Sequence, residues 1–328
     1  MVGKRINQVL EEAEQNGRCL ASSSRADERW LQRGVERGEI VRPHRGMYAR
    51  SSYWGELDCQ QRTLHILAAL AIKHPDWVFA GTSAAVVHGM EVGESDAERL
   101  CLATSKKAHT RTRDSCTRII VSHDTPVTRN DITVTSFSRT VYDCLRMLPF
   151  PAALAIADSA LRGKGIGKDR LARNVVASCG SRKGIERVLS IIALADGRAE
   201  NGGESKVRAS IISCGFVSPT LQYEVTDPLD EAKGYRVDFA WELPDGSLVF
   251  GELDGKEKYT NPQMTGGVPT EDLLLKERRR ESRITLANTP IRVMRFSFAE
   301  ACDQAYFARL LDAYGVPRAD EIPEVSLT

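Results

Sequence analysis

"RVDFAWELPDGSLVFGELDGKEKY", residues 236–259, decides the fold of the C-terminal part of this 328-residue chain. Two runs rich in apolar residues, RVDFAW and LVFGELD, flank ELPDGS, whose Pro-Asp-Gly is typical of a tight turn. The stretch therefore predicts a β-hairpin. A turn centred near Pro244 and Asp245 places Asp238 opposite Glu252, and Asp254 shares a face with Glu252 because side chains alternate along a strand.

The three hairpin acids have two interpretations. Charged residues on hairpins are commonly solvated, but these acids lie among apolar residues, as in a central strand covered on both faces. Opposed carboxylates with Cβ atoms roughly 5 Å apart are destabilising unless a positive charge lies between them. We therefore expect Asp238, Glu252 and Asp254 to hold a metal ion. Since all the ligands are carboxylate oxygens, Mg²⁺ or Mn²⁺ fits better than zinc.

Two lysines, Lys256 and Lys258, come directly after the hairpin. A metal held by carboxylates beside a lysine suits phosphodiester hydrolysis, because the ion lowers the pKa of a bound water and neutralises charge on the phosphate. The lysine can position the attacking water or stabilise the transition state. The hairpin therefore predicts a metal-dependent nuclease site.

The first 54 residues predict a winged helix-turn-helix domain. Apolar residues at helical spacing in KRINQVLEEAEQNG and LASSSRADERWLQRGVERGEI predict two helices, and IVRPHRGMYAR predicts a small hairpin. In a winged helix, one helix enters the major groove of DNA while a basic wing touches the backbone. The candidate DNA contacts are Arg25, Arg29, Arg33, Arg42, His44 and Arg45. The alternative is that the helical arginines form only the solvated face of an amphipathic helix.

Composition limits the class of protein. The net charge is +1, 42% of residues are hydrophobic, and no run of about 18 apolar residues occurs, which argues against membrane insertion. The eight cysteines are scattered without a C-x-x-C pair, as expected for reduced thiols in a cytoplasmic protein. We expect a multi-domain α+β chain: a winged helix over 1–54, a mixed α/β domain over 55–198 and a helix-flanked sheet over 199–328.

Residues 200–310 resemble the PD-(D/E)xK nuclease superfamily, in the branch related to very-short-patch-repair endonucleases. Glu204 in GGESKVRA matches the family's helix acid, Asp238 its first strand acid, and Glu252 with Asp254 in GELDG its second motif. The family's usual lysine lies two residues after the second acid, where this chain has Asp254. In the resembling branch a His or Lys comes slightly later, so Lys258 in DGKEKY takes that place and Lys256 is the alternative.

The basic stretch KERRRES also resembles the helix that comes after the hairpin in this branch. The resemblance implies that Arg278 and Arg280 contact phosphate or support the acidic site, with Glu277 and Glu281 on the same helix. The alternative is a solvated helical face.

The whole chain, including TSAAVVHG and TSFSRTVYDCL, resembles a bacterial, often actinobacterial, group of abortive-infection-type antitoxins and transcriptional regulators. This resemblance implies that the N-terminal domain binds DNA, often the operon's own promoter, and that a cognate toxin is a partner. The leading hypothesis is a DNA-binding protein with a metal-dependent endonuclease-like C-terminal domain. The alternative is a non-enzymatic regulator or antitoxin in phage defence.

Overall fold

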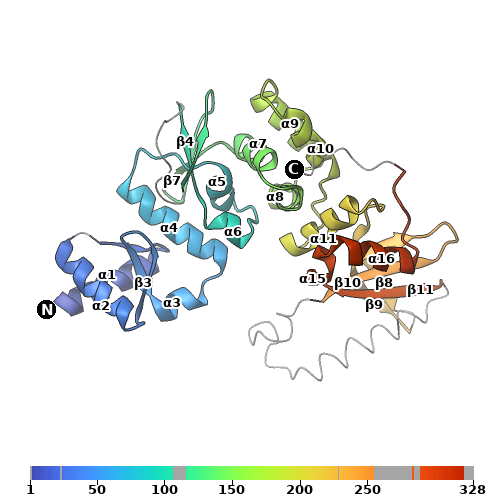
Figure 1. The fold of residues 1–328 in the computed structure, drawn as a ribbon, viewed down its shortest axis with the longest axis horizontal. Coiled ribbons are helices and arrows are strands. Elements are labelled where there is room, and N and C mark those ends of the chain that lie inside the picture. Colours follow the sequence, from blue (N-terminus) through green and yellow to red (C-terminus); the bar gives the residue numbers. More distant parts are fainter. Residues whose placement is uncertain are drawn as a thin grey trace. The chain divides into compact units, whose positions relative to one another are not determined.

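The computed structural model describes residues 2–22, 24–105, 116–227, 229–254, 283 and 289–320 (Figure 1). The chain forms two compact units, Met1–Leu148 with Asp169–Val188, and Pro149–Lys168 with Leu189–Thr328. Both units contain helices and strands, so the predicted multi-domain mixture of α and β structure is confirmed. Within the described ranges, no helix is long and apolar enough to cross a membrane.

The first unit begins with two helices and a small sheet. The elements are α1 (Val2–Gln15), β1 (Leu20–Ala21), α2 (Arg25–Glu36), β2 (Ile40–His44) and β3 (Met47–Arg50). The strands are antiparallel in the order β1-β3-β2. Ser24 is the N-cap of α2, because its hydroxyl accepts a hydrogen bond from Asp27 N–H at 3.2 Å. Ile6 and Leu10 of α1 and Leu31 of α2 pack in one cluster with Ile40 of β2 and Tyr48 of β3.

Helices surround short strand pairs in the rest of the first unit. The elements are α3 (Ser51–Glu56), α4 (Cys59–Lys73), α5 (Gly81–Val87), α6 (Glu94–Ala97), β4 (Leu100–Thr104), β5 (Cys116–Ile120), β6 (Val127–Arg129), β7 (Ile132–Val134), α7 (Phe137–Met147) and α9 (Lys168–Cys179). Strands β4 and β5 are parallel, and β6 and β7 form a hairpin. Cys19 and Met47 pack in one cluster with Leu67 of α4 and Phe79, so the N-terminal sheet shares a core with the middle of the chain.

The second unit is a four-stranded sheet with helices. The elements are α8 (Phe150–Lys164), α11 (Gly202–Ser213), β8 (Thr220–Asp227), β9 (Asp230–Glu242), β10 (Leu248–Asp254), β11 (Ile291–Ser297), α15 (Phe298–Cys302) and α16 (Gln304–Tyr314), while α10 (Ile185–Leu194) starts in the first unit. The strand order is β11-β10-β9-β8, with β8, β9 and β10 antiparallel and β11 parallel to β10.

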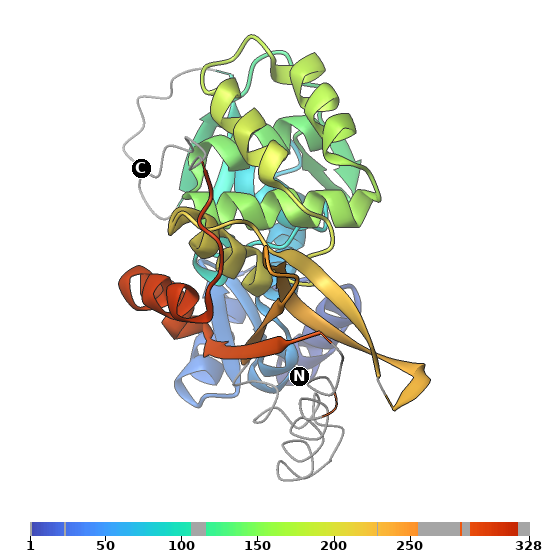
Figure 2. The ribbon, with the colours of Figure 1, turned by 90° about the vertical axis from the view of Figure 1, so that its right-hand side faces the viewer.

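The predicted hairpin is the centre of this sheet. Strands β9 and β10 pair from Leu248↔Glu242 to Gly251↔Phe239, so the predicted register is confirmed. Gly246 turns the chain with φ +78°, in the left-handed region that favours glycine. β9 is longer than β10, so its first half pairs only with β8 and forms a twisted ribbon (Figure 2).

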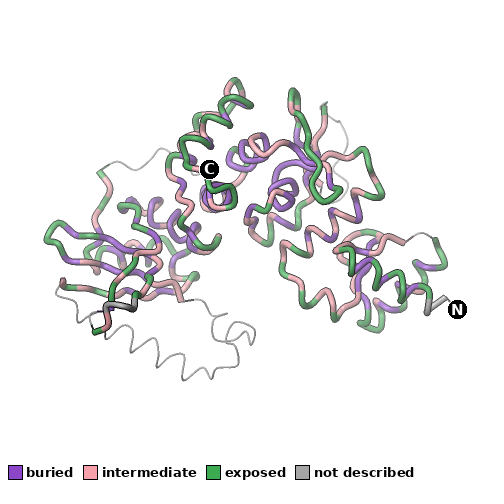
Figure 3. The backbone as a smooth tube through the Cα atoms, turned by 180° about the vertical axis from the view of Figure 1, so that it is seen from behind, coloured by how far each residue is buried: buried purple, intermediate pink, exposed green. Residues whose placement is uncertain are grey.

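Each face of the sheet has its own apolar cluster. The cluster on the helix-covered face includes Phe239, Trp241, Val249 and Phe296 from the strands, and Val207, Ile211, Phe307 and Leu311 from α11 and α16. The cluster on the opposite face is smaller and contains Val237, Ala240 and Phe250. Buried residues run along these strands, as the purple segments in Figure 3 show. Acids near the ends of the central strands are therefore set in an apolar framework.

A buried ion pair joins α8 to α11. Arg208 Nη2 donates to both Asp158 oxygens at 2.7 and 2.8 Å, and the two side chains are 3% and 0% exposed. Asp158 Oδ1 also accepts from Asp196 N–H at 2.8 Å, and Arg208 Nη1 donates to the Leu194 carbonyl. These bonds fix the helix that carries Glu204, one turn before Arg208.

Candidate functional site

Asp238 lies where the β9–β10 ladder ends. The last backbone pair is Gly251↔Phe239, and the same register brings Asp238 and Glu252 next. There, Asp238 Oδ2 accepts a hydrogen bond from Leu253 N–H at 3.0 Å. The Asp238 side chain thus accepts the hydrogen bond that a backbone carbonyl would accept in a regular ladder. This bond holds the Asp238 carboxylate against Leu253, the residue directly after Glu252.

Gln222 lies across from Asp238 on the other neighbouring strand, β8. Its φ is +53°, a conformation that is costly for a residue with a side chain and that tends to occur at functional sites. The distortion changes which face the strand residues occupy. Leu221 packs in the helix-side cluster, whereas Tyr223, two residues later, packs on the opposite face. The regular sheet is therefore interrupted beside Asp238.

Glu204 occupies the first turn of α11 and is only 4% exposed. Its carboxylate accepts hydrogen bonds from Glu200 N–H, from the Asn201 side chain and from the Gln222 side chain, each at 2.9 Å. Burial raises the pKa of the Glu204 carboxyl, and the nearby Asp238 and Glu200 charges add to this, while the Glu200 and Gln222 hydrogen bonds oppose it. Glu204 is thus linked through Gln222 to the strand position opposite Asp238.

Glu252 and Asp254 share an arginine that sequence reasoning missed. The parallel β10–β11 register makes Arg295 the partner of Glu252. Arg295 Nη2 lies 3.3 Å from Glu252 Oε2, and Arg295 Nη1 lies 3.4 Å from Asp254 Oδ1. The positive charge that the opposed acids were expected to need is therefore supplied in part by β11. The sequence signal was the alternation in IRVMRFS, but it could not show which strand β11 joins.

The acids chemically suit a hard divalent ion, since all their donor atoms are carboxylate oxygens. Within the described ranges, no group of three or more His, Cys, Asp or Glu side chains is arranged to hold a metal ion. Mg²⁺ commonly keeps several waters and takes one or two protein carboxylates, so Asp238 and Glu252 fit this pattern. The predicted basic residues of this site, Lys256, Lys258, Arg278 and Arg280, lie outside the described residues.

The arginines proposed to contact DNA are exposed in the first unit. Arg25, Arg29 and Arg33 recur every four residues along α2, and the Nε atoms of Arg29 and Arg33 donate to the carbonyl one turn back. Arg42 and Arg45 are exposed on the β2–β3 hairpin. Among the described residues, none of these five arginines forms an ion pair. Nearby arginines do: the pairs are Arg5–Asp27, Arg37–Glu39 and Arg50–Glu14.

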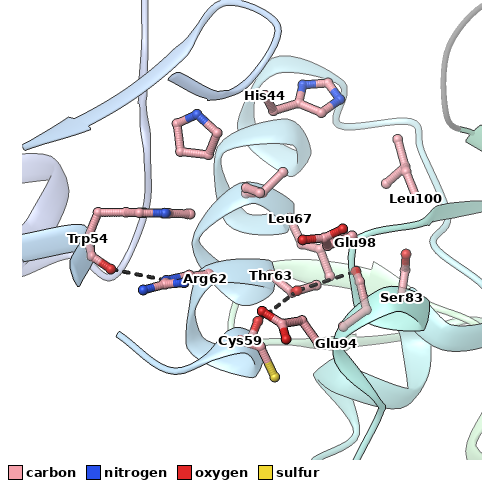
Figure 4. A pocket seen from close by; sticks show the side chains of 13 residues that line it. His44, Trp54, Cys59, Arg62, Thr63, Leu67, Ser83, Glu94, Glu98 and Leu100 are labelled. Atoms are coloured by element: carbon pink, nitrogen blue, oxygen red, sulfur yellow. Dashed lines mark hydrogen bonds between the residues drawn. The ribbon is translucent and has the colours of Figure 1, made fainter. Parts of the chain in front are cut away.

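His44 differs from these arginines because it is half-buried. It lines a cavity of about 420 Å³ together with Trp54, Arg62, Glu94 and Glu98 (Figure 4). Burial lowers the pKa of the His44 imidazole, and the charges of Lys73 and Arg42 lower it further. His44 is therefore a less accessible candidate for DNA contact than Arg42 or Arg45.

Comparison with known proteins gives two relatives, both from Mycobacterium tuberculosis. They are the uncharacterized protein MT2308 of strain CDC 1551 / Oshkosh and the uncharacterized protein Rv2248 of strain H37Rv, each 37% identical over 123 residues. The match covers 38% of this chain and 43% of each relative, so less than half of either relative is represented. No protein-family model and no solved structure matches the chain.

Proposed function

We propose that this protein binds DNA and that its second unit hydrolyses phosphodiester bonds in a metal-dependent, PD-(D/E)xK-like manner. The observation that carries the proposal is the meeting of acids around the end of the β9–β10 ladder. Asp238 bonds to the residue after Glu252, and Glu204 reaches the facing strand through Gln222. The order of α11, β8, β9, β10 and later β11 agrees with the order that the resemblance implies.

Asp238 and Glu252 are the principal metal ligands in this proposal, with Asp254 and Glu204 as further ligands or supporting acids. A bound Mg²⁺ or Mn²⁺ would lower the pKa of a water and neutralise charge on the scissile phosphate. Asp238 uses one oxygen for Leu253 N–H, which orients its carboxylate. Lys258, or else Lys256, would orient the attacking water or stabilise the transition state.

DNA binding in the proposal rests on the charge of the first unit. The exposed arginines of α2 and of the β2–β3 hairpin have no carboxylate partners among the described residues, so their charges are available to phosphates. The succession of helices and hairpin supports a winged helix, with α2 presented to the major groove and the hairpin to the backbone. Arg25, Arg29 and Arg33 would lie along one face of that helix.

The test is nicking of supercoiled plasmid and of single-stranded DNA in the presence of Mg²⁺ or Mn²⁺. The wild-type protein is expected to cleave, and Asp238→Asn is expected to lose cleavage while remaining folded. Asp245→Asn is the matched control, because Asp245 lies in the turn of the same hairpin and, among the described residues, its side chain accepts hydrogen bonds from Ser247. Equal cleavage by wild type and Asp238→Asn would sink the nuclease proposal.

A second candidate function is a regulator or antitoxin that does not cleave DNA. The observation that favours it is the pairing of Arg295 with both Glu252 and Asp254, since these acids already have a cation. This candidate predicts promoter binding that survives Glu252→Gln but fails in an Arg29→Ala, Arg33→Ala double variant. It also predicts a complex with a cognate toxin, detectable when the two proteins are produced together.

A further inference from the structure

We infer that the first unit binds a small phosphate-bearing molecule in a basic concavity separate from the helix and hairpin proposed to contact DNA. The concavity has a volume of about 440 Å³, within the range of small-molecule sites. It is formed by the segment after β5, one face of α7 and the turn after α9. Its lining includes cationic and hydroxyl side chains that could bind phosphate: Ser122, Arg139, Arg146, Ser181, Arg182 and Lys183.

Arg139 forms the buried base of this site and is only 3% exposed. Its Nε donates to Asp143 Oδ2 at 2.7 Å, and its Nη2 donates to the Ile120 carbonyl at 2.8 Å. Its third nitrogen, Nη1, is buried and has no hydrogen-bond partner among the described residues. A buried donor without an acceptor costs free energy, which an anionic oxygen brought in by a ligand would recover. Asp143 balances the charge of Arg139, so the net charge of the site comes from its rim.

The rim carries three further cations. Arg146 and Lys183 are exposed and form no ion pair in the ranges that the structure describes. The Arg146 guanidinium lies 5.9 Å from the centre of the Tyr142 ring, and Tyr142 Oη donates to the Lys183 carbonyl at 2.7 Å. This contact holds the turn that carries Lys183 against α7. The cations are therefore set on a braced framework.

Arg182 braces the opposite wall. Its Nη2 donates to the Ser122 carbonyl, and its Nη1 lies 3.5 Å from Ser122 Oγ. The residue after Ser122 is His123, whose φ of +57° is unusual for a residue with a side chain. The hydroxyls of Ser122 and Ser181 add neutral donors beside the cations.

This combination of guanidinium groups, an ammonium and hydroxyls matches a phosphate or pyrophosphate group, which accepts several charge-assisted hydrogen bonds. Among the described lining residues, Asp143 is the only carboxylate. Its Oδ2 is paired with Arg139, while its Oδ1 is buried and has no hydrogen-bond partner in the described part of the chain, so the ligand's phosphate must bind away from Oδ1. A terminal phosphate of a free molecule can reach toward the recessed Arg139. The phosphates of a DNA duplex would meet only the rim, so the geometry favours a free ligand of nucleotide size.

The experiment is isothermal titration calorimetry on the full-length protein, with inorganic pyrophosphate and ATP as probes in metal-free buffer of low salt. We expect both probes to bind the wild type, and an Arg146→Ala, Lys183→Ala double variant to bind at least tenfold more weakly. Arg173→Ala is the matched control, since Arg173 is exposed on α9 of the same unit and lies outside the lining. Its affinity is expected to stay within twofold of the wild type.

Absence of binding, or equal losses in the double variant and Arg173→Ala, would overturn the inference. A short DNA duplex titrated in parallel separates the two sources of phosphate. If the double variant loses affinity only for the duplex, and pyrophosphate and ATP do not bind the wild type, the concavity belongs to a DNA surface and the free-ligand site is refuted. Both altered residues are exposed, so circular dichroism is expected to match the wild type.

Discussion

The proposed contact between the arginines of the first unit and DNA phosphates is tested most sharply by measuring how DNA affinity depends on salt. Five exposed arginines without ion pairs in the described part lie on α2 and the β2–β3 hairpin. If each neutralises one phosphate, log K falls with log salt with a slope of about −4.5, because each phosphate contributes about 0.9. Raising the salt fourfold then weakens binding about 500-fold. In an Arg29→Ala, Arg33→Ala double variant the slope falls to about −2.7 and the same change weakens binding only about 40-fold.

The assay is fluorescence anisotropy of a labelled duplex over a series of KCl concentrations, with EDTA present so that no cleavage occurs. Arg37→Ala is the control, because Arg37 is exposed in the same region but pairs with Glu39 at 2.9 Å. The slope of log K against log salt for Arg37→Ala is expected to differ from the wild-type slope by less than about 0.9, the contribution of one phosphate. A double variant whose slope equals that of the wild type would refute the assignment, and α2 would then be an ordinary solvated helix.

Two further predictions concern the second unit. Arg208→Met removes the partner of the fully buried Asp158 and leaves its charge uncompensated. The free energy of unfolding, measured with urea, should therefore fall by about 3–5 kcal/mol. A loss below about 1 kcal/mol would contradict the role of this pair. The pKa of the Glu204 carboxyl is raised in the folded state, so the folded protein binds the proton more tightly and this contribution to stability is complete below the unfolded pKa. This stabilising contribution is lost as the pH rises through the folded pKa of Glu204. The free energy of unfolding of Glu204→Gln, measured with urea across this pH range, should therefore fall less steeply with pH than that of the wild type. Wild-type and variant stability curves that run parallel would contradict the raised pKa of Glu204.

The hairpin could be predicted from sequence because its determinants are local. The turn residues near Pro244 and Asp245 and the apolar alternation on both sides fix the pairing, and the observed register agrees with them. The helix beginning at Arg25 is equally local, since its Ser24 cap and its apolar face lie within one segment.

The charge balance of the site could not be predicted because it depends on contacts between distant segments. Arg295 reaches Glu252 only because β11 joins β10 in parallel, across a connection of more than thirty residues. The left-handed conformation of Gln222 has no signal in its own sequence, since glycine would be the expected residue there. His44 likewise lines a cavity whose other walls come from later segments, around Trp54, Arg62 and Glu98, and this placement has no signal in the residues next to His44.

The central claim is that the hairpin acids hold a divalent ion, and calorimetric titration of Mn²⁺ tests it most directly. The wild type is expected to bind Mn²⁺ with an affinity that falls at least tenfold in Asp238→Asn and in Glu252→Gln but is unchanged in Asp245→Asn. Arg295→Met should tighten binding, because the acids then lose the guanidinium that pairs with them in the absence of metal. Mn²⁺ binding that is absent, or that is the same in the wild type and Asp238→Asn, would contradict the claim.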